Sequence, residues 1–145
     1  MKRSIIFTSL FFAFLVMGCG DLGQSDDFPP KDQTVKQAYV GYWKLIDAQG
    51  SPFYLYLRDD GRGYSTWNQG TKGEWHLEAE RVITRWQSGW VDWIYHENGH
   101  FKKLAFAPGT PLSYQATSVT IATKITKDQI PKEDLELLNI LQESD

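Results

Sequence analysis

The histidines and carboxylates of the chain are the first candidates for chemistry at a metal or acid–base site. His96 and His100 stand on either side of Asn98-Gly99, and His76 lies earlier in the chain. Asn-Gly is a strong signal for a two-residue hairpin turn, because both turn positions need a positive φ. In such a hairpin His96 and His100 point to opposite faces of the sheet, so we expect no joint metal site. The sequence also has no Gly-x-Ser-x-Gly and no glycine-rich phosphate loop, so we expect no enzymatic activity and no cofactor.

The single cysteine, Cys19, is the next candidate, and it ends the segment LVMGC at positions 15–19. It follows Lys2-Arg3 and an apolar run of about 15 residues, shorter than the ~20 that a membrane-spanning helix needs. This pattern resembles the signal peptide of bacterial lipoproteins, in which Val16, Gly18 and Cys19 would occupy the aliphatic, small and cysteine positions. The resemblance implies cleavage before Cys19 and attachment there of a thioether-linked diacylglycerol, usually with a third acyl chain.

Two other interpretations of this segment stay open: an ordinary secretory signal cut after Gly18, and an uncleaved membrane anchor. In lipoproteins of double-membrane bacteria, Asp directly after the cysteine favours the inner membrane, whereas this chain has Gly20 there. We therefore predict a membrane partner through lipidated Cys19, at the outer rather than the inner membrane of the cell envelope. The predicted organisation is a signal peptide over 1–18, a flexible tether over 19–37 and a single domain over 38–145.

The charge of the exported chain argues against some partners. Removing Lys2 and Arg3 leaves 13 of the 15 basic residues against 18 acidic ones, so the formal charge changes from −3 to −5. An acidic chain without a basic block is a poor candidate for nucleic acid. With one cysteine only, the domain must hold its core without disulfides.

Aromatic residues are abundant, with 6 Trp, 7 Tyr and 8 Phe. They can line a pocket for an apolar or amphiphilic ligand, or they can simply supply buried area in a small β core. The ring residues that we predict for a ligand pocket are Trp43, Trp75, Trp86, Trp93 and Tyr95. The residues that we predict for an exposed, partner-binding aromatic face are Tyr54, Tyr56 and Trp67.

Period-two alternation places these rings on strands. Between Tyr39 and Ile125 about eight short runs follow one another through turns, with no helix between them, which predicts an antiparallel meander. Closing the meander into a barrel removes exposed edges, and a sandwich is the alternative. After Pro131, leucines recur at helical spacing and predict one C-terminal α-helix over about 131–142. This helix could pack on Ile83 and Ile94, which the register described next points outward, or it could cap a barrel end.

Two turns set the predicted register of residues 82–106. The Asn-Gly turn pairs Trp93 with Leu104. If Ser88-Gly89 is a second two-residue turn, it places Arg85 opposite Asp92 as a charge pair on the face that does not carry Trp93. A slip of one residue would move every side chain to the opposite face.

The triplet Gly41-Tyr42-Trp43 resembles the Gly-x-Trp pattern that starts the first strand of lipocalins and related small barrels. In that family the tryptophan plugs the barrel base, and a meander of about eight strands precedes a C-terminal helix. The resemblance implies an all-β, lipocalin-like barrel. It also implies a basic residue stacked on Trp43, for which Lys124 is the candidate, although the predicted alternation of its strand points Lys124 outward.

Taken together, these patterns predict a lipid-anchored, non-enzymatic lipoprotein of the cell envelope that binds a small apolar or amphiphilic ligand in a β-barrel. The alternative is an envelope interaction or assembly factor that uses an exposed aromatic sheet face.

Overall fold

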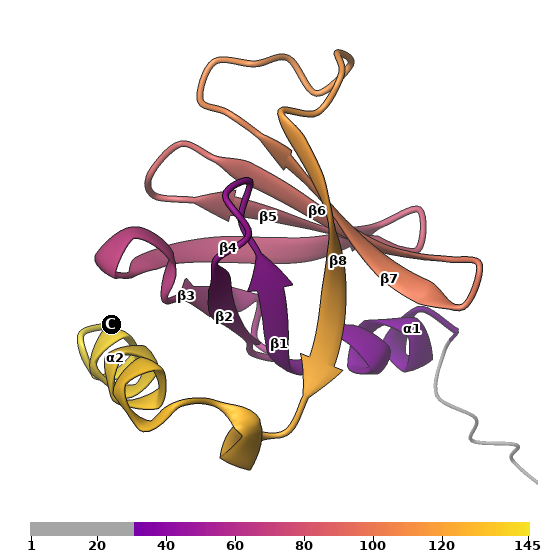
Figure 1. Cartoon of the computed structure of the whole chain (residues 1–145). Coiled ribbons are helices and arrows are strands. Elements are labelled where there is room, and N and C mark those ends of the chain that lie inside the picture. Colours follow the sequence, from indigo (N-terminus) through magenta and orange to yellow (C-terminus); the bar gives the residue numbers. More distant parts are fainter. Residues whose placement is uncertain (1–30) are drawn as a thin grey trace, which may run out of the picture.

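The computed structural model describes residues 31–145, which form a closed barrel of eight antiparallel strands flanked by two helices (Figure 1). Each strand pairs with its neighbours in sequence, and β1 pairs with β8 to close the barrel. The predicted meander, its closure and the C-terminal helix are confirmed. The elements are α1 (Lys31–Tyr39), β1 (Gly41–Ile46), β2 (Pro52–Leu57), β3 (Arg62–Ser65), the 3₁₀ turn η1 (Trp67–Gln69), β4 (Thr71–Glu78), β5 (Arg81–Trp86), β6 (Val91–Glu97), β7 (His100–Phe106), β8 (Ser118–Ile125), η2 (Lys127–Gln129) and α2 (Lys132–Glu143).

Alternation along β1 and β2 fills the barrel interior with large apolar side chains. Trp43 and Leu45 of β1, and Leu55 and Leu57 of β2, are completely buried and belong to one cluster. Each such side chain stabilises the fold by roughly 1.5–3 kcal/mol relative to exposure. This cluster is the main core of the domain.

Two glycines lie against the ring of Trp86 in the barrel interior. A Cβ at Gly73 would stand 2.5 Å from the Arg85 carbonyl oxygen and 2.8 Å from the Trp86 ring. A Cβ at Gly63 would meet the same ring at 3.5 Å. Gly73 is therefore required for the Trp86 ring to lie in this place, whereas a Cβ at Gly63 would make only ordinary van der Waals contact with it.

Helix α1 lies at the barrel end formed by the β2–β3, β4–β5 and β6–β7 turns (Figure 1). The Tyr39 hydroxyl donates to the Glu80 carbonyl oxygen at 2.7 Å, and the Trp43 indole N–H donates to the Tyr39 carbonyl oxygen at 2.9 Å. These contacts hold the helix against the core. The predicted tether therefore ends too late, since residues 31–37 are helical; its residues 19–30, like the predicted signal peptide, lie outside the described residues.

Lys124 takes the position that the lipocalin resemblance implies. Its Nζ lies 5.8 Å from the centre of the Trp43 ring and donates to the Ala38 carbonyl oxygen at 2.6 Å. The predicted outward orientation was wrong, because β8 turns Ala122 inward and leaves Val119 and Ile121 each 61% exposed. The bulky residues of β1 fill the interior, so β8 contributes small or slender side chains there.

The β6–β7 hairpin has the predicted register. Asn98 and Gly99 have φ values of 52° and 80°, and Trp93 lies opposite Leu104. This pair lies on the outer surface of the barrel, because Asp92 and Ile94, the neighbours of Trp93 on β6, are the buried ones.

The β5–β6 hairpin differs from its predicted register by one residue. The Trp86 N–H donates to the Trp90 carbonyl oxygen at 2.9 Å, so the loop has three residues, and the last of them, Gly89, has φ 88°. A type I turn followed by a left-handed glycine is the usual form of such a loop. As a result Thr84, not Arg85, lies opposite Asp92, and the predicted outer charge pair was wrong.

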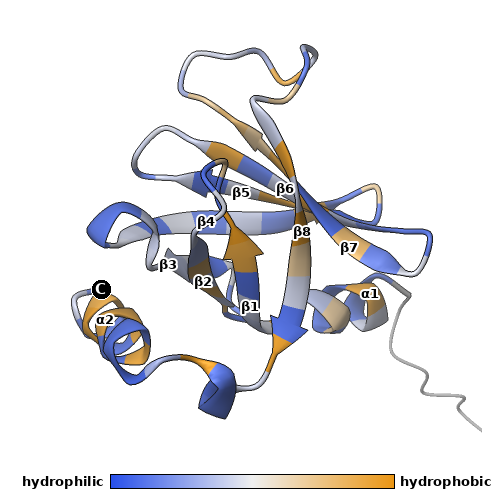
Figure 2. Ribbon diagram, viewed as in Figure 1, coloured by the Kyte–Doolittle hydropathy of each residue, from blue (hydrophilic) through white to orange (hydrophobic). Residues whose placement is uncertain are grey.

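Helix α2 covers the outer face of β2 and β3. Figure 2 shows apolar and polar residues around this helix, as its leucine spacing predicts. Leu138 is completely buried in a second cluster with Tyr54 and Tyr64. The predicted packing against Ile83 and Ile94 was wrong, since Ile94 points into the barrel and α2 contacts β2 and β3. Neither α1 nor α2 is long and apolar enough to span a membrane.

The β4–β5 turn offers a simple test of local strain. Ala79 and Glu80 occupy its two central positions with φ values of 48° and 62°, although alanine disfavours a left-handed backbone. Asparagine tolerates this conformation, so Ala79→Asn is expected to raise the free energy of unfolding by about 0.5–1 kcal/mol. The β6–β7 turn supplies the reverse change, since Asn98→Ala at φ 52° should lower it by a similar amount. Urea denaturation followed by tryptophan fluorescence measures both; shifts in the same direction would contradict the strain argument.

Candidate functional site

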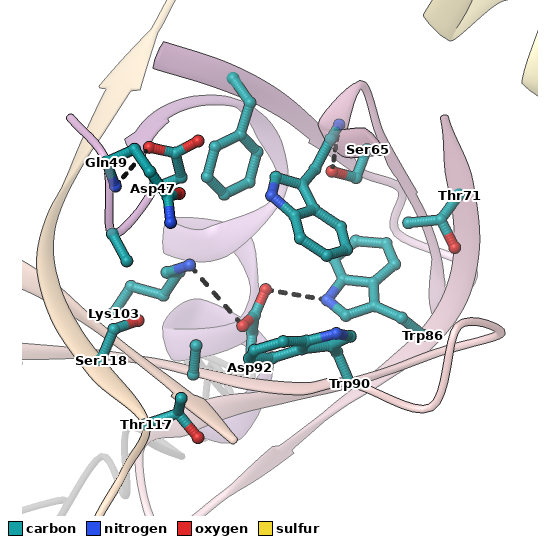
Figure 3. A pocket seen from close by; sticks show the side chains of 14 residues that line it. Asp47, Gln49, Ser65, Thr71, Trp86, Trp90, Asp92, Lys103, Thr117 and Ser118 are labelled. Atoms are coloured by element: carbon teal, nitrogen blue, oxygen red, sulfur yellow. Dashed lines mark hydrogen bonds and ion pairs between the residues drawn. The ribbon is translucent and has the colours of Figure 1, made fainter. Parts of the chain in front are cut away.

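A pocket opens among the β1–β2, β5–β6 and β7–β8 loops and η1 (Figure 3). Figure 1 shows these loops at the barrel end opposite α1. The volume of the pocket is about 150 Å³. The lining combines aromatic walls with polar side chains. The residues around it are Asp47, Ala48, Gln49, Phe53, Ser65, Trp67, Thr71, Trp86, Trp90, Asp92, Lys103, Ala105, Thr117 and Ser118.

The centre of the pocket holds a buried ion pair between β6 and β7. Asp92 is 5% and Lys103 4% exposed, and Lys103 Nζ lies 3.8 Å from Asp92 Oδ1. The Trp86 indole N–H donates to Asp92 Oδ2 at 2.8 Å. Burial raises the pKa of the Asp92 carboxyl, and the Lys103 ammonium and the Trp86 N–H oppose that rise. A paired charge at this depth is the most distinctive polar feature of the barrel interior.

Four aromatic rings surround the pair (Figure 3). Lys103 Nζ lies 4.9 Å from the centre of the Phe53 ring, close enough for a cation–π contact. Trp67 and Trp90 meet edge to face with their ring centres 5.6 Å apart, and Trp86 completes the wall. The pocket therefore offers flat apolar surfaces around one polar point, as small-molecule sites commonly do.

Hydrogen bonds within the loops fix the rim of the pocket. Asp47 Oδ1 accepts from the backbone N–H groups of Gln49 at 2.9 Å and Ser51 at 2.8 Å. On the opposite side, Thr117 Oγ1 accepts from the Ala107 N–H at 3.0 Å. These bonds order the backbone of the β1–β2 loop and of the two ends of the β7–β8 loop at the rim of the pocket.

The five residues predicted for the ligand pocket lie in three different regions: the pocket wall, the core beneath α1 and the outer face of the barrel. Trp86 lines the pocket. Trp43 and Trp75 lie inside the barrel, in the core beneath α1, where Lys36 Nζ stands 5.5 Å from the Trp75 ring. Trp93 and Tyr95 lie on the outer face, so their predicted place inside the barrel was wrong. The one-residue shift in the β5–β6 loop explains this error for the strand that follows.

The predicted exposed face of Tyr54, Tyr56 and Trp67 does not form as one surface. Tyr54 is 6% exposed beneath α2, which we did not expect to cover this face. Tyr56 stacks on Tyr42 with ring centres 4.4 Å apart, and Trp67 belongs to the pocket wall. The placement of this predicted partner surface was therefore wrong.

Sequence reasoning missed Asp92, Lys103 and Trp90. The available signal was the segment Gln87-Ser88-Gly89, which fits a three-residue loop as well as Ser88-Gly89 fits a two-residue turn. With three residues, the alternation of β6 places Asp92 inside, and the Asn-Gly turn then places Lys103 beside it.

Within residues 31–145, no group of three or more His, Cys, Asp or Glu side chains is arranged to hold a metal ion. His96 packs edge to face on Phe101, with ring centres 5.0 Å apart, and His100 is exposed.

Comparison of the chain with protein-family models, curated proteins and solved structures gives no match. The class of protein therefore follows from the architecture. A closed eight-strand meander with a pocket at one end is a small antiparallel β-barrel, and it is consistent with a lipocalin-like barrel.

Proposed function

We propose that this chain is a non-enzymatic, lipid-anchored envelope lipoprotein whose barrel binds a small amphiphilic ligand. The observation that carries the binding role is the pocket around Asp92 and Lys103, with an apolar wall and one polar point. The anchor is supported by the sequence around Cys19, which resembles a lipoprotein signal and lies outside the described residues.

The size of the pocket limits the ligand. A cavity of about 150 Å³ is of the size that accommodates benzene, and it is smaller than the roughly 300–1,000 Å³ of sites for drug-sized molecules. The ligand therefore places one ring, or a segment of similar volume, inside the barrel. Any larger remainder extends past the loops at the open end.

Filling the pocket tests the binding role. Ser118 lines the pocket from β8, so Ser118→Phe is expected to weaken binding at least about tenfold by occupying the ligand volume. Thr123→Phe adds the same ring to the exposed outer face of the same strand and should change binding by less than about twofold.

Tryptophan fluorescence reports on binding, because three of the wall residues are tryptophans. The probes are p-cresol, toluene, cyclohexanol and dodecanoate, each titrated into the wild-type chain and both variants. A panel in which no probe changes the emission would count against a ligand-binding barrel. An equal loss in both variants would place binding elsewhere on the molecule.

A further inference from the structure

The ion pair in the pocket is too far apart to be satisfied by itself. A hydrogen bond from an ammonium to a carboxylate spans about 2.7–3.2 Å, whereas Lys103 Nζ and Asp92 Oδ1 are 3.8 Å apart. An ammonium has three donors, and Lys103 Nζ directs its charge at the Asp92 carboxylate 3.8 Å away and at the Phe53 ring face. Asp92 Oδ2 already accepts from Trp86, which leaves Oδ1 for another donor.

A single oxygen atom fits this gap. An atom about 2.8 Å from both Lys103 Nζ and Asp92 Oδ1 is compatible with their 3.8 Å separation. A hydroxyl group can accept from the ammonium and donate to the carboxylate, because it is both acceptor and donor. The bridge satisfies both charged groups with one ligand atom.

Charge argues for an uncharged ligand. The ammonium and the carboxylate offset each other, so a second carboxylate or ammonium would leave a net charge in a site where both side chains are more than nine-tenths buried. Desolvating an unbalanced charge is costly. A ligand carboxylate would also be repelled by the Asp92 carboxylate, and a ligand ammonium would be repelled by the Lys103 ammonium.

The walls argue for a flat ring. Trp67, Trp86 and Trp90 present indole faces and edges, and such surfaces favour stacked or edge-to-face aromatic contacts. A saturated sugar of similar size would carry hydroxyl groups on several edges, and these walls would leave most of them unpaired.

We propose that the pocket recognises an uncharged, hydroxylated aromatic ring of the phenol class, whose hydroxyl bridges Lys103 and Asp92. This inference rests on the proposed ligand-binding function and narrows it to one ligand chemistry.

The test is a matched ligand series on the unmodified domain. The probes p-cresol, toluene, p-toluate and 4-methylbenzylamine share a methylated benzene ring and differ in the para substituent, which is a hydroxyl, a hydrogen, a carboxylate and an aminomethyl group. Affinities come from ¹⁵N NMR titrations of the indole N–H resonances, in which the Trp86 signal reports on the Asp92 contact. We expect p-cresol to bind at least about tenfold more tightly than the other three and to shift the Trp86 signal most.

Different failures have different meanings. Toluene binding as tightly as p-cresol would overturn the hydroxyl bridge and leave the ligand-binding barrel standing, as would tighter binding of p-toluate or the amine. Binding of methyl α-glucopyranoside in preference to p-cresol would overturn the aromatic class only. Binding of dodecanoate alone would overturn the aromatic class, the neutral ligand and the hydroxyl bridge together, and would leave the ligand-binding barrel standing. If neither the series nor these two probes shift any pocket indole signal, both the inference and the proposed function fail.

Discussion

Replacing Lys103 with methionine is expected to lower the free energy of unfolding by about 3–5 kcal/mol. The substitution keeps an apolar stem of similar length but leaves the Asp92 carboxylate buried without its ammonium. An uncompensated charge in the barrel interior is costly because the surrounding rings cannot solvate it. The measurement is urea denaturation at pH 7, followed by tryptophan fluorescence.

Lys102→Met is the matched control on the same strand. Lys102 is the neighbour of Lys103 but lies on the outer face, where its ammonium pairs with the Glu97 carboxylate. Exposed pairs contribute little to stability, so the midpoint should hardly move. A comparable loss in both variants would mean that β7 is merely intolerant of methionine.

Acidification separates a buried charge from a packing defect. In the Lys103→Met variant, burial raises the pKa of Asp92 with no ammonium to oppose the rise, so the folded chain binds a proton more tightly than the unfolded chain, whose Asp pKa is about 3.9. The free energy of unfolding of the variant therefore falls as the pH rises from the pKa of Asp92 in the unfolded chain through its pKa in the folded chain. It recovers on acidification. The deficit relative to wild type should shrink between pH 7 and pH 5, and adding Asp92→Asn should reduce it at pH 7. If neither acidification nor Asp92→Asn reduces the deficit, the loss of stability is due to packing and not to a buried charge.

The features that sequence reasoning predicted correctly are those governed by local rules. The alternation of β2 is unambiguous because Phe53, Leu55 and Leu57 are more apolar than their neighbours, and all three are buried. The Asn98-Gly99 turn allows one geometry, so the β6–β7 register followed from it. Together with the short turns between about eight such runs, these local rules predicted an antiparallel meander, and the structure shows that it closes.

The pocket could not be predicted in the same way, because it depends on the length of one loop. Whether the β5–β6 loop has two or three residues decides if Asp92 faces solvent or the interior. Pattern rules choose the solvent, since burying a carboxylate is unfavourable without a partner. The partner, Lys103, lies eleven residues further along and becomes adjacent only when β6 and β7 pair. The burial of Asp92 is thus compensated only in the folded barrel, where Lys103 lies next to it.

Strand β8 shows a second limit of periodicity. Its most apolar residues, Val119 and Ile121, point outward, while Ala122 is buried and Lys124, on the same face as Ala122, reaches over the Trp43 ring. The inward positions are decided by the space that Trp43 and Leu45 leave across the strand pair, where only a small residue or a slender chain fits. The hydrophobic pattern alone therefore assigns the side chains of β8 to the wrong faces of the sheet.

Cys19→Ser is expected to abolish acylation of the chain and to move it out of the membrane fraction when it is produced in a double-membrane bacterium. A serine oxygen cannot form the thioether that the lipoprotein resemblance implies. Without the diacylglycerol no stable anchor remains, because two or three acyl chains hold a protein at a membrane while one binds only marginally, with K of about 10⁴ M⁻¹. Labelling with an alkyne-tagged fatty acid and mass spectrometry of the N-terminal peptide measure acylation, and fractionation measures the location of the chain.

The same experiment distinguishes the competing interpretations of residues 1–19. An ordinary secretory signal predicts a soluble chain with and without the substitution, and an uncleaved anchor predicts a membrane-bound chain in both cases. Only lipidation predicts that the wild-type chain is in the membrane fraction and the Cys19→Ser chain is in the soluble fraction. The barrel should be unaffected, because Cys19 precedes the described domain, and an equal urea midpoint for both forms checks this. Gly20→Asp adds a test of destination, since the resemblance implies that Asp after the cysteine shifts the protein from the outer to the inner membrane on a density gradient.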